Sequence, residues 1–143
     1  MKVRKILLIH GPNLNLLGAR EPDIYGKESQ DQLFEFINLA FPEIEFIFFQ
    51  SNHEGLIIDA IHENKGLVDA MIINAGALSH YSYAIRDAIK AVNINTIEVH
   101  ISDVNNREDF RRELVLSDVC LETITGKGKQ GYLLAVKKIE ELH

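Results

Sequence analysis

The 143-residue chain has one cysteine, no tryptophan, three prolines and no hydrophobic run near the ~20 residues that a membrane-spanning helix needs. Its single cysteine, Cys120, excludes an internal disulfide. Basic residues are outnumbered, 15 against 21 acidic ones, and they are dispersed along the chain. The net charge of −6 therefore argues against a nucleic-acid surface. We expect neither a membrane nor a nucleic acid as partner.

The start of the chain, MKVRK, is basic like the start of a signal peptide. The apolar stretch that follows is only Ile6-Leu7-Leu8-Ile9, and no small-residue cleavage site comes after it. We therefore expect a cytoplasmic protein. With 46% hydrophobic residues and no linker or repeat, residues 1–143 suit a single compact domain.

Short apolar runs alternate with amphipathic stretches along the whole chain. Residues 72–74 and 96–101 are apolar on both faces, which is typical of strands covered by helices on both sides. Cys120 is expected to be a buried strand residue. The predicted strands are 4–10, 44–50, 68–74, 94–100 and 119–124, and the predicted helices are 29–41, 55–65, 80–92, 107–115 and 130–142.

This alternation predicts an α/β fold in three layers, with a five-stranded parallel sheet between helices. Five strand–helix units favour the flavodoxin-like strand order 2-1-3-4-5. Ligands of such sheets bind beyond the carboxyl ends of strands 1 and 3, where the strand order reverses. The chemically interesting side chains should therefore follow strands 1, 3 and perhaps 4.

Segment 11–26, GPNLNLLGAREPDIYG, follows the first strand and carries Asn13, Arg20 and Tyr25. A guanidinium close to a phenol favours the phenolate form, which is a base. An ordinary structured surface loop is the alternative interpretation, but loops on rigid scaffolds often carry function.

Glu98 and His100 stand two residues apart at the end of the fourth strand, so strand pleating puts both on one face. A carboxylate beside an imidazole fixes its tautomer and raises its basicity. The competing interpretation is a structural histidine that makes its hydrogen bonds inside the core. The pairing at a strand end favours a catalytic role.

After the third strand come Asn74, whose amide can donate and accept hydrogen bonds, and His80, at the start of the next helix. Asp87 lies about two turns further and should share the helix face of His80, unless it pairs with Arg86. His10, at the end of the first strand, could support the site by hydrogen bonding.

Ser102 and the amides near it should open a short helix and offer an anion site. Arg107 and Arg111 are four apart on that helix and should share a face. One or both of these arginines could bind a carboxylate. For Arg107, a place on a solvent-exposed charged surface is an equally good interpretation.

The residues fit proton-transfer chemistry, with Tyr and His as the acid–base pair and Arg and Asn as electrostatic support. They indicate a lyase acting on a small anionic hydroxy-ketone. A metal site built from His10, His80, His100 and Asp103 is a competitor, although no H-x-H or HExxH spacing is present. A second competing interpretation is a non-catalytic domain that binds anions.

Five blocks resemble the type II 3-dehydroquinate dehydratases, the type II dehydroquinases. The blocks are GPNLNLLGAREPDIYG, SNHEG, NAGALSHYSYAIRDA, EVHISDVNNREDFRR and GKQGYLLA, in the order and spacing of that family. The resemblance implies the shikimate-pathway conversion of 3-dehydroquinate to 3-dehydroshikimate, by anti elimination of water through an enolate. It implies no metal, no cofactor and no lysine Schiff base.

The resemblance also implies a role for each matched residue. Tyr25 would be the base and Arg20 its activator, and Asn13 would position a water near the enolate. His100 would protonate the leaving hydroxyl with Glu98 behind it. The substrate-binding residues would be Asn74, His80, Ile101, Ser102 and Arg111, with Asp87 reaching a neighbour's site in a homododecamer built of trimers. Asp103 departs from the family's usual asparagine and adds negative charge near an anionic substrate.

Overall fold

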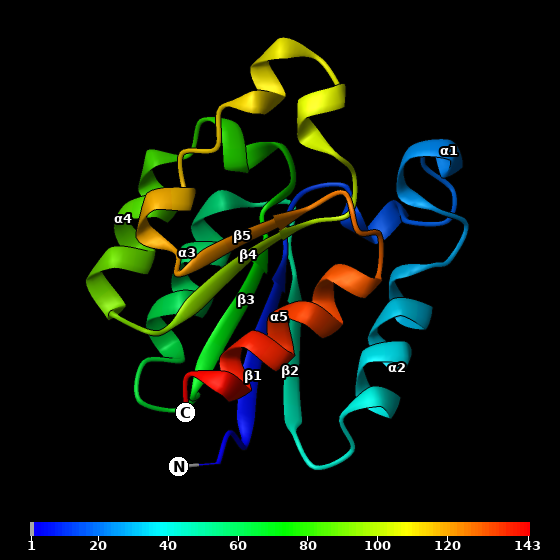
Figure 1. Cartoon of the computed structure of the whole chain (residues 1–143). Helices are drawn as coiled ribbons and strands as arrows, with labels where there is room; N and C mark the ends of the chain where they lie inside the picture. The colour runs from blue at the N-terminus through cyan, green and yellow to red at the C-terminus, as the bar shows by residue number, and fades with distance from the viewer. Residues whose placement is uncertain (1) are drawn as a thin grey trace.

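The computed structural model describes residues 2–143 and contains one five-stranded sheet (Figure 1). Every neighbouring pair of strands is parallel, and the order is β2-β1-β3-β4-β5. This confirms the predicted flavodoxin-like topology. The strands are β1 (Lys5–His10), β2 (Glu45–Gln50), β3 (Ala70–Asn74), β4 (Thr96–His100) and β5 (Glu122–Thr125).

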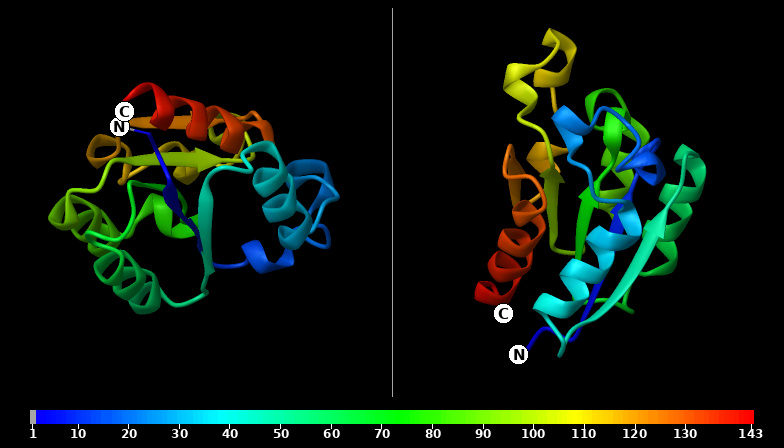
Figure 2. Two further views of the ribbon diagram at one scale, coloured as in Figure 1. Left: turned by 90° about the horizontal axis from the view of Figure 1, so that it is seen from below. Right: turned by 90° about the vertical axis from the view of Figure 1, so that its right-hand side faces the viewer.

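Helices cover both faces of the sheet (Figure 2). Helices α2 (Gln30–Ala40) and α5 (Gln130–Glu141) lie on one face, and α3 (Glu54–Glu63) and α4 (Tyr83–Val92) lie on the other. The chain steps outward from β1 to β2 and then back past β1 to β3. Because such crossovers are right-handed, this reversal puts α2 and α3 on opposite faces. The reversal opens a crevice beyond the carboxyl ends of β1 and β3.

Strand β1 shows how the sequence builds two hydrophobic cores from one strand. Ile6 and Leu8 pack with residues of α2 and α5, whereas Leu7 and Ile9 pack with residues of α3 and α4. Successive side chains of a strand point to opposite faces, so a fully apolar run fills both layers. All four side chains are 0% exposed.

The ends of α2 follow the sequence signals. The Ser29 hydroxyl accepts from the Gln32 amide at 3.1 Å, and the Gln32 side chain accepts from the Ser29 amide at 2.9 Å. This reciprocal capping box satisfies backbone donors that the first turn leaves open. The helix ends at Ala40, two residues before Pro42 and one residue short of its predicted end at 41.

The carboxyl ends of β1 and β3 approach closely because residue 11 is a glycine. Its amide donates to the Asn74 carbonyl at 2.8 Å. A Cβ atom at Gly11 would lie 2.2 Å from the Ala75 carbonyl oxygen, so any side chain would force the two loops apart. The floor of the crevice therefore depends on this glycine.

Three local predictions are wrong. The predicted helix 80–92 begins only at Tyr83, and residues 76–80 form a separate 3₁₀ helix, η2 (Gly76–His80). Within the predicted helix 107–115 the chain forms only a short 3₁₀ helix, η4 (Asp109–Arg112), which another, η3 (Val104–Asn106), precedes. Cys120 precedes β5 and is only partly buried. None of the helices in residues 2–143 is both long and apolar enough to cross a membrane.

Candidate active site

A small pocket of about 30 Å³ lies beyond the carboxyl ends of β1, β3 and β4. It collects side chains from the three segments that the sequence singled out, and Arg107 of the third segment is among them. Asn13, Glu98 and Asp87 do not line it. The predicted site residues that do line it are Arg20, Tyr25, Asn74, His80, His100, Ile101, Ser102 and Arg111.

Tyr25 is the last residue of the short helix α1 (Pro22–Tyr25), and two guanidinium groups lie close to its ring. The Cζ atom of Arg20 lies 4.4 Å from the centre of the Tyr25 ring, and that of Arg107 lies 5.1 Å from it. Arg107 also donates from Nη1 to the Tyr25 hydroxyl at 2.6 Å. Of the two arginines, Arg107 therefore makes the direct contact with the phenolic oxygen.

Arg107 is largely buried, with 11% of its side chain exposed. Its Nη1 also donates to the Ser102 hydroxyl at 3.3 Å, and its Nη2 lies 3.8 Å from a Glu21 carboxylate oxygen. The Tyr25–Arg107 contact forms part of the wall between the small pocket and a larger cavity of about 520 Å³. Tyr25 and Arg107 line both cavities, and the small pocket is the narrower of the two.

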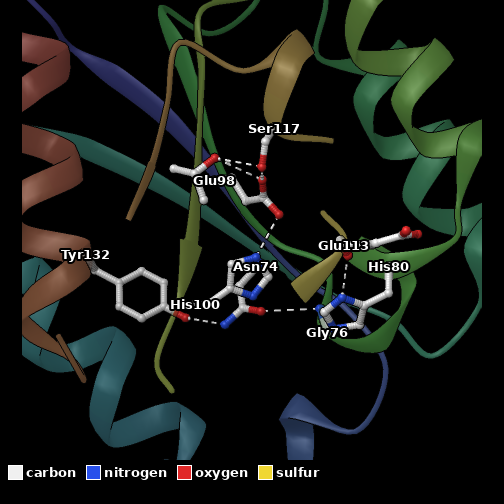
Figure 3. A network of polar contacts seen from close by, with 9 residues as sticks. Asn74, Gly76, His80, Glu98, His100, Glu113, Ser117 and Tyr132 are labelled. Atoms are coloured by element: carbon white, nitrogen blue, oxygen red, sulfur yellow. Dashed lines mark hydrogen bonds and ion pairs between the residues drawn. The ribbon is translucent and has the colours of Figure 1, made fainter. Parts of the chain in front are cut away.

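His100 and Glu98 form a buried pair at the end of β4 (Figure 3). Nε2 of His100 lies 2.7 Å from the Glu98 carboxylate, and the two residues are 5% and 0% exposed. The other Glu98 oxygen accepts from the Ser117 hydroxyl at 2.8 Å and the Thr123 hydroxyl at 3.1 Å. A buried carboxylate needs such donors. Because Nε2 is occupied by Glu98, Nδ1 is the nitrogen of His100 left for chemistry.

His80 lies at the end of η2, not on α4, so the prediction that it shares a helix face with Asp87 is wrong. Its Nδ1 donates to the Glu113 carbonyl at 2.8 Å, and its ring centre is 6.4 Å from that of His100 (Figure 3). Burial, more than any other cause, lowers the pKa of His80, and this outweighs the opposing effect of its hydrogen bond to Glu113. His80 therefore favours the neutral form, with Nε2 as an acceptor.

Asn74, at the end of β3, is 4% exposed and is held at both ends of its amide (Figure 3). Its Nδ2 donates to the Tyr132 hydroxyl at 3.0 Å, and its Oδ1 accepts from the Gly76 amide at 3.2 Å. Nδ2 carries a second hydrogen, which is the donor available to a ligand.

Asn13 and Asp87 are both exposed and lie outside the small pocket. Asn13 adopts a left-handed backbone conformation (φ 69°), and its amide donates to the Asn52 side chain at 2.9 Å. Non-glycine residues in that region are often tied to function. Arg86, the alternative partner of Asp87, pairs instead with Asp118.

Ser102 opens no α-helix, and the expectation that Arg107 and Arg111 share a helix face is wrong, because Arg107 lies between η3 and η4. The Ser102 and Ile101 carbonyls accept from the Gly126 and Gly128 amides at 3.0 and 3.1 Å, which fixes this segment against the loop before α5. Arg111 forms an ion pair with Glu108, so a carboxylate already occupies its guanidinium.

Comparison with known proteins decides the family. The family model described as "Dehydroquinase class II" matches residues 4–140. The chain belongs to this family. Among curated relatives, a 3-dehydroquinate dehydratase of Caldicellulosiruptor saccharolyticus is 52% identical over 145 residues, covering 98% of this chain and 99% of the relative. That of Bacillus subtilis is 45% identical and covers 92% of this chain and 90% of its own length.

Solved class II dehydroquinase structures have the same fold. The type II dehydroquinase of Butyrivibrio crossotus superposes with a TM-score of 0.93 at 50% identity, over 96% of this chain and 97% of that one. The type II dehydroquinase of Propionibacterium acnes gives 0.92 at 36% identity and 98% coverage of both chains. A 3-dehydroquinate dehydratase-like protein of Bifidobacterium longum gives 0.70 at 25% identity and 97% coverage of both.

Asp103 stands where the family usually has asparagine, and its side chain bonds to residues of its own loop. Its carboxylate accepts from the Asn105 amide at 3.1 Å and the Asn106 side chain at 2.7 Å, as the cap of η3. It lines the larger cavity and not the small pocket. The four side chains of the competing metal site do not converge, and residues 2–143 contain no cluster of three or more His, Cys, Asp or Glu suited to a metal ion.

Several residues that support this site were not predicted from the sequence. Tyr132 contacts Asn74 from α5, and Ser117 and Thr123 hold Glu98. These residues come from segments that carry apolar stripes or short turns, and no local pattern marks them. Their hydroxyl groups in otherwise apolar, core-facing runs were the available signal, because a buried hydroxyl needs a partner.

Proposed function

We propose that Tyr25 and His100 are the base and the acid with which this class II dehydroquinase converts 3-dehydroquinate to 3-dehydroshikimate and water. One observation carries the proposal. A phenol paired with a buried guanidinium and an imidazole paired with a buried carboxylate line the same pocket. A simple anion-binding domain needs neither pair, and nothing observed favours that alternative.

The first step is removal of a proton beside the substrate carbonyl. The phenolate of Tyr25 accepts that proton, and the electron pair moves onto the carbonyl oxygen as an enolate. The guanidiniums of Arg20 and Arg107, 4.4 and 5.1 Å from the ring centre, stabilise the phenolate before the proton is taken. Asn13 is proposed to hold a water against the enolate oxygen.

The second step expels the hydroxyl group. The enolate returns its electrons to the ring, the carbon–oxygen bond breaks, and His100 gives a proton to the departing oxygen. The Glu98 carboxylate, 2.7 Å from Nε2, stabilises the imidazolium form that this requires. Anti elimination, which the resemblance to the family implies, requires that base and acid act from opposite sides of the substrate, and the proposed reaction is reversible.

Substrate binding is assigned to the remaining lining residues. The carboxylate of 3-dehydroquinate would meet Asn74 and the backbone amides of Ile101 and Ser102, a segment fixed by the loop before α5. His80 and Arg111 would bind the ring hydroxyls, with Arg111 leaving Glu108 to do so. No metal or cofactor has a part in this scheme.

The test is the ultraviolet absorbance of the conjugated enone that appears when 3-dehydroquinate is added to purified protein. We expect full activity in the presence of a chelator and no lysine adduct after borohydride treatment. Tyr25→Phe should lower kcat by about 10²–10⁴-fold with little change in KM, the range typical of acid–base groups. Tyr81→Phe, at a 62% exposed tyrosine, is the matched control. Near-normal turnover in Tyr25→Phe would exclude Tyr25 as the base.

We further propose that residues 1–143 act as a single catalytic domain in the cytoplasm, assembled into a homododecamer of trimers. Exposed side chains on α4 and η4 support an assembly, since Tyr83 and Phe110 are 65% and 58% exposed. Asp87, also exposed on α4, would then reach a neighbour's site. Light scattering after size-exclusion chromatography measures the assembly, and a monomer with full activity would contradict it.

A further inference from the structure

We infer that Tyr132 and His10, both outside the pocket, are positioning residues that fix which end of the Asn74 amide faces the substrate. The inference rests on the proposed function, because it gives Asn74 the task of donating to an anionic substrate. Neither residue touches the pocket, so each acts through Asn74.

Four side chains form one continuous chain of hydrogen bonds behind the site. Nδ2 of Asn74 lies 3.0 Å from the Tyr132 hydroxyl, and that hydroxyl lies 2.8 Å from Nε2 of His10. Nδ1 of His10 lies 2.8 Å from Oε1 of Gln30. Tyr132 and His10 are 0% exposed and Asn74 is 4% exposed, so water does not compete with these bonds.

The direction of each bond follows from the chemistry of the groups. Oε1 of Gln30 can only accept, so Nδ1 of His10 carries the hydrogen. Burial lowers the pKa of His10 to about 4, so near neutral pH the ring is uncharged and Nε2 is an acceptor. The Tyr132 hydroxyl must then donate to His10, which leaves its oxygen to accept from Asn74.

Asn74 is therefore fixed from two sides. The Tyr132 oxygen requires a donor, which only Nδ2 of the amide can be. The Gly76 amide requires an acceptor, which only Oδ1 can be, at 3.2 Å. Rotating the amide by half a turn would break both bonds at once. The second Nδ2 hydrogen thus remains the group that Asn74 offers, which suits a carboxylate better than a carbonyl oxygen would.

The strand register makes this arrangement possible. His10 and Asn74 are paired residues of neighbouring strands β1 and β3, so their side chains leave the sheet side by side. Tyr132 enters from the first turn of α5 and spans both. Because Tyr132 is the first link beyond Asn74, its hydroxyl is the atom to remove.

A double-mutant cycle between Tyr132 and Asn74 tests the inference on the full-length enzyme. Tyr132→Phe should raise KM for 3-dehydroquinate roughly three- to tenfold, the effect of one hydrogen bond between neutral groups, with a smaller change in kcat. In the Asn74→Ala background the same substitution should change KM by less than about twofold, because the amide it orients is gone. Additive effects on KM would overturn the inference and leave a purely structural role for Tyr132.

A second variant keeps the test decisive if Tyr132→Phe does not fold. Gln30→Leu removes the acceptor that selects the His10 tautomer, from a residue at the start of α2. We expect a KM increase that again disappears in the Asn74→Ala background. A KM that Gln30→Leu leaves unchanged contradicts the inference. An inactive wild-type protein would instead refute the proposed function.

Discussion

The Tyr25 hydroxyl accepts a 2.6 Å hydrogen bond from Arg107, a residue 82 positions further along the chain. Arg20, only five positions away, lies over the ring at 4.4 Å and does not donate to the oxygen. The phenol thus has one cation at its oxygen and another at its face. The nearer residue in sequence is not the one that holds the reactive atom.

Arg107→Gln should therefore lower kcat at least as much as Arg20→Gln. Both substitutions remove a positive charge that lies against the Tyr25 ring and would stabilise the phenolate during proton removal. Steady-state kinetics at one pH measure kcat for both variants. If Arg107→Gln kept the wild-type kcat while Arg20→Gln did not, the Arg107 contact would belong only to the unliganded enzyme.

Arg111→Ala should act mainly on binding. A hydrogen bond to a charged donor corresponds to roughly a ten- to hundredfold change in KM, and kcat should change much less. Arg112→Ala is the matched control, since its side chain is 58% exposed and pairs only loosely with Asp109 at 3.8 Å. An equal loss of kcat and kcat/KM in Arg111→Ala would instead place this residue in the transition state.

Thr123→Val should destabilise the folded protein because it removes a donor to the buried Glu98 carboxylate. Leaving a charged acceptor partly unsatisfied costs about 1–3 kcal/mol. Thr125→Val is a matched control on the same strand, since in residues 2–143 the structure shows no hydrogen bond from its hydroxyl. Urea unfolding at pH 7 gives both values, and equal stabilities of the two variants would argue against the role of Thr123.

Stability should fall on acidification because His10 is buried and uncharged. Its pKa is about 4 in the folded protein and near 6.5 in an unfolded chain, so between these values only the unfolded chain binds the proton. The contribution of His10 to the free energy of unfolding is therefore fully present above pH 6.5. About 3 kcal/mol of it is lost as the pH falls to 4. The lowered pKa of His80 adds a decline of the same sign.

Urea unfolding at pH 7, 5.5 and 4.5 tests this dependence. His10→Asn should flatten the slope of unfolding free energy against pH, whereas His62→Gln, at an exposed histidine, should not. A slope that His10→Asn leaves unchanged would show that other groups dominate acid unfolding.

The regular elements could be read from periodicity because apolar residues on a strand or helix follow its repeat. The fully apolar β1 and the capped α2 are examples, and both were predicted close to their observed bounds. The segment 101–121 could not be read in this way. Its helical turns are 3₁₀ pieces of three or four residues, too short to show a repeat, and Arg107, between two of them, is held by its contact with the distant Tyr25.

The order of the strands and the gathering of the three polar segments at one edge were fixed by local pattern together with the handedness of crossovers. These are properties that each stretch of sequence carries by itself. Which cation reaches the Tyr25 oxygen, and which hydroxyl group turns the Asn74 amide, depended on the folded chain. Such contacts join residues 82 and 58 positions apart, and they are selected by loop path and close packing, which no local repeat encodes.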